Sequence, residues 1–235
     1  MATENYLQCE RKSTFFAMTM VAGFFGAYTY LLRGGVFCNA QTGNIVLLGM
    51  ALGSMNWSRA LYLLIPISAY IGGAIVSEYL DLRLTQFGRL RWDTVLVGFE
   101  CLVVAVLGLL PEETPDQVCQ VALNFICSMQ FNTFRQAEGL PGTTTFCTNH
   151  IRLIGVHLVK DIRDGDRSSR ARWKFHLTMI LTFLAGCVIS TAACHFFKYR
   201  TILGAAAVLA IVFARLCYAD LTTERSRHSD LPRGH

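Results

Sequence analysis

Six long apolar runs constrain this chain more than any other feature of its sequence. Each run has roughly the 17–25 residues with which a helix crosses a hydrocarbon core of about 30 Å. Because lipid cannot hydrogen-bond peptide groups, segments that cross it must be helical. The runs are Thr14–Leu32, Ala60–Leu80, Thr94–Leu110, Val118–Phe134, Phe175–Phe197 and Thr201–Tyr218. The sequence therefore predicts an all-α, polytopic helical membrane protein with six spanning helices, the first of which stays in the membrane uncleaved.

Composition agrees with this class and argues against others. Only 16% of the 235 residues are charged, against about 25% in soluble domains, and the mean hydropathy is +0.39. The nine cysteines form no C-x-x-C pair and several lie inside apolar runs, so neither a zinc site nor a disulfide framework is indicated. No cofactor is expected. The basic residues behind the net charge of +5 sit in short loops, which favours the lipid bilayer over nucleic acid as the partner.

The two halves of the chain resemble each other. The matching residues are Ala17 with Ala122, Gly34 with Gly139, Asn44 with Asn149, Ala69 with Thr182, Gly73 with Gly186 and Ser77 with Ser190. The last three pairs form a ridge of small residues, which lets membrane helices approach closely. We therefore predict two repeats, at about 14–110 and 118–218.

A short segment follows the first long helix of each half, and these two segments decide the topology. Thr42–Met55 would reach only about 21 Å as a helix, too short to span. Its counterpart, Asn149–Val159, contains His150, Arg152 and His157, which lipid does not tolerate at mid-depth. Both are predicted to be re-entrant half-helices shielded by the other helices. Each half then crosses the membrane an odd number of times, which inverts the second repeat relative to the first.

Loop charges favour this six-span topology. With the N-terminus inside, every Lys and Arg lies on the inner side except Arg33, Arg59, Lys198 and Arg200, and the acidic loop at 112–116 lies outside. Crossing by the short segments as well would move further basic residues outside. We therefore predict a cell-membrane protein with both termini in the cytoplasm: a tail over 1–13, one membrane domain over 14–218 and a tail over 219–235.

The segment after the first run carries a motif. Residues 36–49 read Val-Phe-Cys-Asn-Ala-Gln-Thr-Gly-Asn-Ile-Val-Leu-Leu-Gly, which resembles the signature of the YoaK family, multi-pass membrane proteins catalogued as domain of unknown function 1275. The resemblance covers about residues 14–218 and implies no established activity. The chain departs from the pattern at Gly26, where many relatives carry an acid, and at Cys147-Thr148-Asn149, where Thr-Gly-Asn would complete the symmetry.

The motif residues predict a site at the half-helix ends. Thr42 is the expected N-cap, Gly43 allows a close backbone approach, and Asn44 projects an amide into the interior. The free N–H groups and the positive dipole end of such a helix favour an anionic solute. The alternative is that Thr42 and Asn44 only satisfy backbone groups of the turn. The full predicted lining is Asn39, Gln41, Thr42, Gly43, Asn44, Glu100, Gln130, Asn132, Thr148 and Asn149.

Several polar residues lie within or near the ends of the predicted spans. An unpaired ionised carboxyl at mid-depth costs roughly 2.5–3.5 kcal/mol. Glu100 should therefore be protonated, face a wet cavity or pair with Arg135 or Arg152; a neutral carboxyl bonded to a neighbouring helix is the alternative. Gln130 and Asn132 are expected to face the bundle interior. Arg215, one turn from the end of the last run, should extend to the surface.

Three function classes remain compatible with these features. A small-molecule transporter or channel leads, because inverted halves and half-helix ends converge at depth. A non-transporting scaffold or regulatory protein is the second. A membrane-embedded enzyme is the third: Glu100, Cys147 and His150 offer its only chemistry, and no P-loop, Gly-x-Ser-x-Gly or His-Glu-x-x-His motif occurs, so no catalytic residue is assigned. His150 and His157 share a helical face but are too few donors for a metal. A homo-oligomer is compatible with the sequence.

Overall fold

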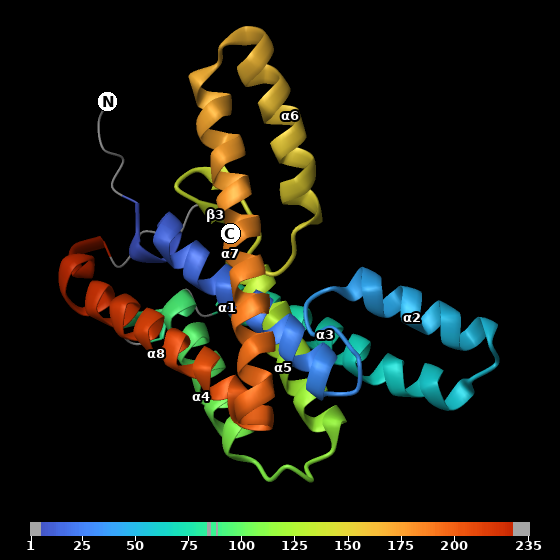
Figure 1. The fold of residues 1–235 in the computed structure, drawn as a ribbon. Helices are drawn as coiled ribbons and strands as arrows, with labels where there is room; N and C mark the ends of the chain where they lie inside the picture. The colour runs from blue at the N-terminus through green and yellow to red at the C-terminus, as the bar shows by residue number, and fades with distance from the viewer. Residues whose placement is uncertain (1–5, 84–85, 88, 228–235) are drawn as a thin grey trace.

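Eight α-helices run through residues 6–83, 86–87 and 89–227, the part of the chain that the computed structural model describes (Figure 1). They are α1 (Lys12–Leu32), α2 (Gln41–Gly53), α3 (Trp57–Arg83), α4 (Trp92–Leu109), α5 (Asp116–Thr133), α6 (Thr148–Asp164), α7 (Arg167–Phe197) and α8 (Leu203–Tyr218). The predicted all-α fold class is confirmed. Each of the six apolar runs and both short segments lies in a helix except for at most two residues at one end, whereas α6 extends five residues beyond its predicted segment and α7 begins eight residues before its run.

Short elements join the helices. Strand β1 (Gln86–Phe87) pairs antiparallel with β2 (Leu90–Arg91), and β3 (Gln136–Ala137) pairs antiparallel with β4 (Leu140–Pro141). Three 3-10 turns, η1 (Gln8–Glu10), η2 (Lys198–Ile202) and η4 (Arg225–Arg227), and one π-helical turn, η3 (Ala219–Thr223), complete the path. Among the described residues, each of these hairpins is a two-stranded sheet that pairs with no further strand.

The centre of the molecule is built from helix pairs that join distant parts of the chain. Helix α1 packs along α7, α3 packs along α5, and α4 packs against α8. Glycines bring the first two pairs close: a Cβ built on Gly186 would lie 2.0 Å from the Met20 carbonyl oxygen, and one on Gly73 would lie 2.2 Å from that of Phe125. Backbone contact at this distance leaves no room for any side chain.

Two helical arms project from this centre (Figure 1). The α2–α3 arm consists of α2 with the beginning of α3, and the α6–α7 arm consists of α6 with the first half of α7. The turn of the α6–α7 arm passes through Gly165 at φ 63°, after which the Asp166 carboxylate accepts hydrogen bonds from the backbone N–H groups of Ser168 and Ser169. Such an N-cap is worth about 1 kcal/mol.

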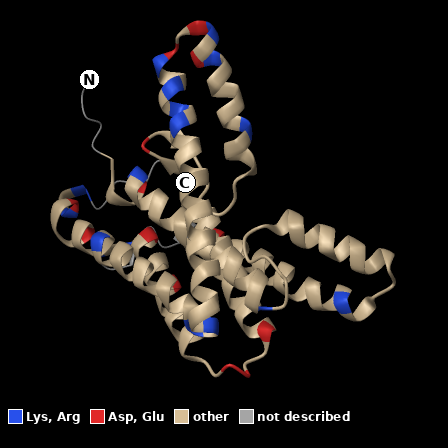
Figure 2. Ribbon diagram, viewed as in Figure 1, with Lys and Arg blue, Asp and Glu red and all other residues tan. Residues whose placement is uncertain are grey.

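The two arms differ in charge. Lys, Arg, Asp and Glu gather on the α6–α7 arm, whereas the α2–α3 arm is almost free of them (Figure 2). Helix α2 packs on α3, but Ile45, Val46 and Met50 are exposed. The expected shielding of α2 by several other helices is therefore wrong, because α2 lies at the edge of the bundle.

Four helical stretches of the described residues are long and apolar enough to cross a membrane: Lys12–Leu32, Trp57–Leu80, Trp92–Leu109 and Arg167–Thr223. The last stretch contains both α7 and α8. Helix α5, one of the predicted spans, falls outside this set because buried amides such as Gln120, Asn124 and Gln130 reduce its hydropathy.

Candidate functional site

A pocket with a volume of about 510 Å³ opens where α2 and α6 begin, and we call it the half-helix pocket. Its lining is Asn39, Ala40, Gln41, Thr42, Tyr70, Phe146, Thr148, Asn149 and Arg152. Five of the predicted lining residues, from both halves of the chain, are therefore brought to one place. Tyr70 of α3 supplies an aromatic wall.

The loop before α2 is fixed to two other helices. The buried Asn39 amide donates to the Ala22 carbonyl of α1 at 2.8 Å. Gln41 Nε2 donates to Asn124 Oδ1 of α5, also at 2.8 Å. These bonds hold the start of α2 against the centre of the bundle, so the pocket wall has a defined position without a ligand.

Asn44 closes this loop and does not line the pocket. It is fully buried, its Oδ1 accepts from the Phe37 backbone N–H at 3.0 Å, and its Nδ2 donates to the Phe37 carbonyl and to Gln41 Oε1. A Cβ on Gly43 would lie 3.1 Å from the Phe37 ring, so the loop also needs a small residue there. This geometry favours the structural alternative for Asn44.

The expected N-cap at Thr42 is wrong. Helix α2 begins at Gln41 after Ala40, whose side chain makes no capping bond. Thr42 therefore lies inside the first turn, where its exposed side chain lines the pocket. Ala40, the residue before α2, has no hydroxyl or carboxylate that could cap the first-turn N–H groups. These N–H groups point out of the start of α2, which is the end that borders the pocket.

The opposite wall comes from α6. Asn149 Oδ1 accepts from Arg152 Nη2 at 3.0 Å and from Nε at 3.3 Å, which holds the guanidinium one turn above the helix start. Arg152 is the only charged residue among the described residues that line the pocket. Two helix N-termini and one guanidinium give the pocket a positive electrostatic potential, which suits an anion or a carboxylate.

Glu100 is not part of the half-helix pocket. Its side chain is fully buried on α4, and neither carboxyl oxygen has a hydrogen-bond partner among the described residues. The expected pairing with Arg135 or Arg152 is wrong: Arg135 bonds Asn132 and Glu78, and Arg152 bonds Asn149. An unpartnered carboxyl in an apolar core is a protonated one.

Gln130 and Asn132 also lie away from the pocket. Gln130 is buried and donates from Nε2 to Thr144 Oγ1 at 2.8 Å, which ties α5 to the loop before α6. Asn132 donates to Glu78 Oε2 of α3 at 3.0 Å. Both amides connect elements, so their predicted role in a solute lining receives no support from their positions.

Three histidines stack between α6 and α7. The Nδ1 atoms of His150 and His176 are 2.8 Å apart, and His150 Nε2 lies 2.9 Å from the Thr143 carbonyl oxygen. Because the Thr143 carbonyl can only accept, His150 carries its proton on Nε2. His150 Nδ1 is then the acceptor, and His176 Nδ1 is the donor. His157 stacks on His176 with ring centroids 6.1 Å apart. Burial lowers the pKa of His157, and the nearby cations of Arg172 and Lys160 lower it further.

These histidines do not converge on one point. No group of three His, Cys, Asp or Glu side chains in the described part of the chain is placed to hold a metal ion. The nitrogens that face each other in His150 and His176 are already joined by a hydrogen bond. The stack is therefore a packing contact of the α6–α7 arm.

The sequence prediction assigned no role to Tyr70, Phe146 or His176, although the first two line the pocket and the third bonds His150. Tyr70 lies in an apolar run that indicates only a span, and no local pattern marks its exposure to the pocket. His176 is the second residue of a similar run, Phe175–Phe197. Phe146, however, could have been found, because the offset that matches Gly34 with Gly139 also matches Gln41 with Phe146.

Comparison with known proteins supplies a family and no activity. No curated protein and no solved structure matches the chain. A family model described as a protein of unknown function, DUF1275, matches residues 14–215, which includes all eight helices in whole or in most of their length. The apolar helices and this match fit an integral membrane protein. The chain is a member of the DUF1275 family.

Proposed function

We propose that this protein moves a small, anionic solute across the cell membrane as a transporter or channel. The solute site is the half-helix pocket, where the starts of α2 and α6 meet. That meeting of equivalent segments from both halves is the observation that carries the proposal, because membrane transporters place their sites where interrupted helices of two inverted repeats converge.

The packing of the centre supports inverted repeats. The matched glycines Gly73 and Gly186 contact the backbone of Phe125 and Met20, two residues separated by the same offset as Gly34 and Gly139. The pairing of α3 with α5 thus repeats the pairing of α7 with α1. Gly34 and Gly139 also share a left-handed backbone, at φ 72° and 76°.

Helix lengths and charges support six spans with α2 and α6 as re-entrant segments. The 13 residues of α2 extend about 20 Å, less than a hydrocarbon core. Helix α6 has 17 residues but carries several charges and two buried histidines. In this topology the acidic loop between α4 and α5 faces outside, the tip of the α6–α7 arm faces the cytoplasm, and both termini are cytoplasmic.

A solute-dependent thermal-shift screen on detergent-purified protein tests the proposal. The probes are acetate, lactate, succinate, phosphate, sulfate and chloride, with uncharged sugars and alcohols for comparison. An anion that binds the folded state at 100 times its Kd would add about 2.7 kcal/mol of stability. That gain should be lost in Asn149→Leu and Thr42→Leu and retained in Ser58→Leu, which alters an exposed residue of the α2–α3 arm.

The same screen separates the alternatives. Anion binding that survives both pocket substitutions would remove the half-helix pocket as the site. Indifference to every probe, together with no anion flux in proteoliposomes, would favour the non-transporting scaffold. Turnover of a probe would favour the enzyme.

A further inference from the structure

A second pocket lies between the N-terminal segment and the end of α8. Its volume is about 490 Å³, and we call it the N-terminal pocket. Its polar lining is Gln8, Arg11, Arg215, Tyr218, Thr223 and Glu224. Residues far apart in the sequence thus converge on a cavity that the transport proposal does not use.

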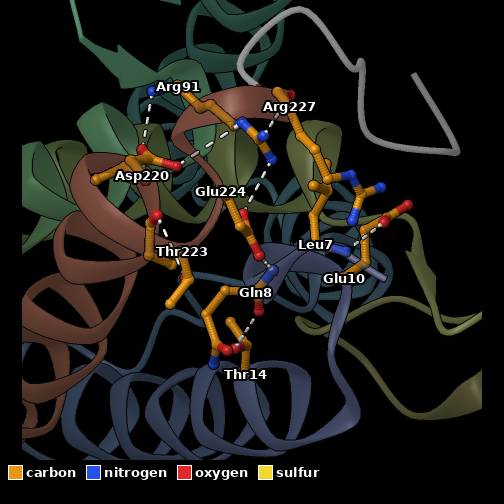
Figure 3. Close-up of polar contacts among 11 residues, drawn as sticks. Leu7, Gln8, Glu10, Thr14, Arg91, Asp220, Thr223, Glu224 and Arg227 are labelled. Atoms are coloured by element: carbon orange, nitrogen blue, oxygen red, sulfur yellow. Dashed lines mark hydrogen bonds and ion pairs between the residues drawn. The ribbon is translucent and has the colours of Figure 1, made fainter. Parts of the chain in front are cut away.

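A buried ion-pair network adjoins this pocket through Glu224, one of its lining residues (Figure 3). Arg91, only 3% exposed, pairs with Glu224 at 3.2 Å and with Asp220 at 3.7 Å. The other oxygen of Glu224 accepts from the backbone N–H of Gln8 at 2.7 Å. Both oxygens of this carboxylate are therefore engaged, and its charge is offset by Arg91.

The two arginines of the lining are different. Arg11 and Arg215 are exposed, and neither guanidinium makes a hydrogen bond or ion pair with another described residue. Gln8 Nε2, a buried atom in the same lining, also has no partner in the described structure. Among the described residues, the pocket thus presents two cations without a hydrogen bond or ion pair and one unused donor, and its one acid is paired with Arg91.

The backbone of the pocket wall is irregular. After Tyr218 the chain continues as a π-helical turn, Ala219–Thr223, which is wider than an α-turn and often marks functional sites. This turn carries Asp220 into the network and leaves Tyr218 and Thr223 on the pocket side. The Thr223 hydroxyl donates to the Ala219 carbonyl at 3.5 Å, which leaves the exposed Tyr218 hydroxyl as an additional donor to an oxyanion.

We infer that the N-terminal pocket binds the phosphate group of an anionic membrane lipid. Paired guanidinium groups are the side chains that suit phosphate best. Arg215 lies one turn before the end of α8, and Tyr218 is 65% exposed, an arrangement typical of the membrane–water interface. The exposed Ile211, one turn deeper on α8, offers an apolar path for an acyl chain.

The second repeat does not carry an equivalent of Arg11 in this pocket. The offset that relates the two halves places Asp116 at the position equivalent to Arg11, so the corresponding place in the second repeat carries the opposite charge. The proposed six-span topology puts the N-terminal pocket at the cytoplasmic leaflet, which is where anionic lipids create a negative surface potential. The inference depends on that topology only for the leaflet.

The test compares lipids and a soluble phosphate on detergent-purified protein. Dioleoylphosphatidylglycerol should raise the thermal unfolding temperature, whereas dioleoylphosphatidylcholine and inorganic phosphate should not. In R11Q/R215Q the phosphatidylglycerol concentration giving half the effect should rise roughly tenfold or more, since each arginine near a membrane surface contributes appreciably to anionic-lipid binding. R11K/R215K keeps the charge but not the guanidinium geometry, so it should retain part of the effect and fall between the unaltered protein and R11Q/R215Q.

A matched control removes the same charge elsewhere. R167Q/R172Q alters two exposed arginines at the α6–α7 arm and should respond to phosphatidylglycerol as the unaltered protein does. An equal loss in this control would overturn the inference in favour of unspecific attraction. Equal stabilisation by inorganic phosphate would overturn the lipid as the ligand, and an unchanged response in R11Q/R215Q would overturn the site. None of these outcomes depends on solute binding at the half-helix pocket.

Discussion

Asn44 shows how one side chain can replace a missing regular structure. Its amide makes both of the hydrogen bonds that the Phe37 backbone would otherwise find in a helix, and it does so while fully buried. Buried peptide groups without partners are costly, most of all in a membrane protein. The asparagine therefore determines where α2 starts, and through it the shape of the half-helix pocket.

Replacing this amide should lower stability in the absence of any ligand. Asn44→Leu leaves the Phe37 N–H and carbonyl without partners, which costs about 1–3 kcal/mol for each buried group. Thermal unfolding of detergent-purified protein should show a clearly lower midpoint. Thr42→Leu, two residues away and exposed, should change the free energy of unfolding by no more than about 0.5 kcal/mol, so its midpoint should stay close to that of the unaltered protein. Equal midpoints for Asn44→Leu and the unaltered protein would contradict the structural role.

At the scale of elements, the helices could be predicted from the sequence far better than the site. Apolar runs identify spanning helices because burial in lipid demands both helicity and hydrophobicity over a fixed length. The half-helix pocket could be anticipated only in part, since its lining depends on which face of α3 turns toward the starts of α2 and α6. Glu100 illustrates the limit: its depth was evident from the sequence, but its separation from Arg135 and Arg152 depends on tertiary packing.

The close helix pairs should not tolerate a methyl group at their contact glycines. Gly186→Ala would place Cβ 2.0 Å from the Met20 carbonyl oxygen and force α7 away from α1. Overpacking of this kind costs about 1–3 kcal/mol or more. Gly155→Ala in α6 meets nothing within 4 Å and should be neutral or slightly stabilising, because alanine favours helix. Chemical denaturation of both variants measures the difference, and comparable stabilities would contradict the close approach.

The α6–α7 arm should loosen in acid. Because burial holds the pKa of His157 below its usual value, the opened arm binds a proton more readily than the closed one. The stabilising effect of the neutral ring is therefore complete above the ordinary histidine pKa of about 6.5 and is lost as the pH falls below it. The hydrogen-exchange protection of residues 150–164, measured relative to the intrinsic exchange rate at each pH, should therefore fall as the pH is lowered from 7.5 to 5.5.

A second group in this arm titrates lower. The Arg170 guanidinium and the Trp173 indole N–H hold the pKa of Asp161 below its ordinary value, so this contact stabilises the arm above about pH 4 and weakens only in stronger acid. His157→Gln should therefore weaken the loss of hydrogen-exchange protection between pH 7.5 and 5.5, whereas Asp161→Asn should lower that protection throughout the range. The reverse pattern would contradict the assignment of the pH response to His157.

At the scale of the whole molecule, charge divides the protein into two ends. The loop between α4 and α5 carries Glu112 and Glu113, whereas the α6–α7 arm carries a cluster of Lys and Arg mixed with acidic residues at its tip (Figure 2). The two features lie at opposite ends of the ribbon in Figures 1 and 2. The positive-inside rule then predicts a fixed orientation in the membrane.

Cysteine labelling would test that orientation. Glu113→Cys and Arg167→Cys are each made in a background that lacks accessible native cysteines. The two introduced thiols should then be accessible from opposite faces of the membrane. An impermeant maleimide should label position 113 from outside and position 167 only after permeabilisation. Labelling of both positions from the same face would refute the six-span topology and with it the inversion of the repeats.

The crossed pairing of α1 with α7 and α3 with α5 also sets an order of events during synthesis. Helix α1 leaves the ribosome first, yet its partner lies in the second repeat and appears only when most of the chain has been made. Until then, Gly23 and the surface around Met20 are open to lipid or to other nascent helices. Helices that insert separately and associate later can meet this demand. Neither half carries the partners of its own first helix, so the halves should be unable to assemble when produced apart and should recover a native-like complex when produced together.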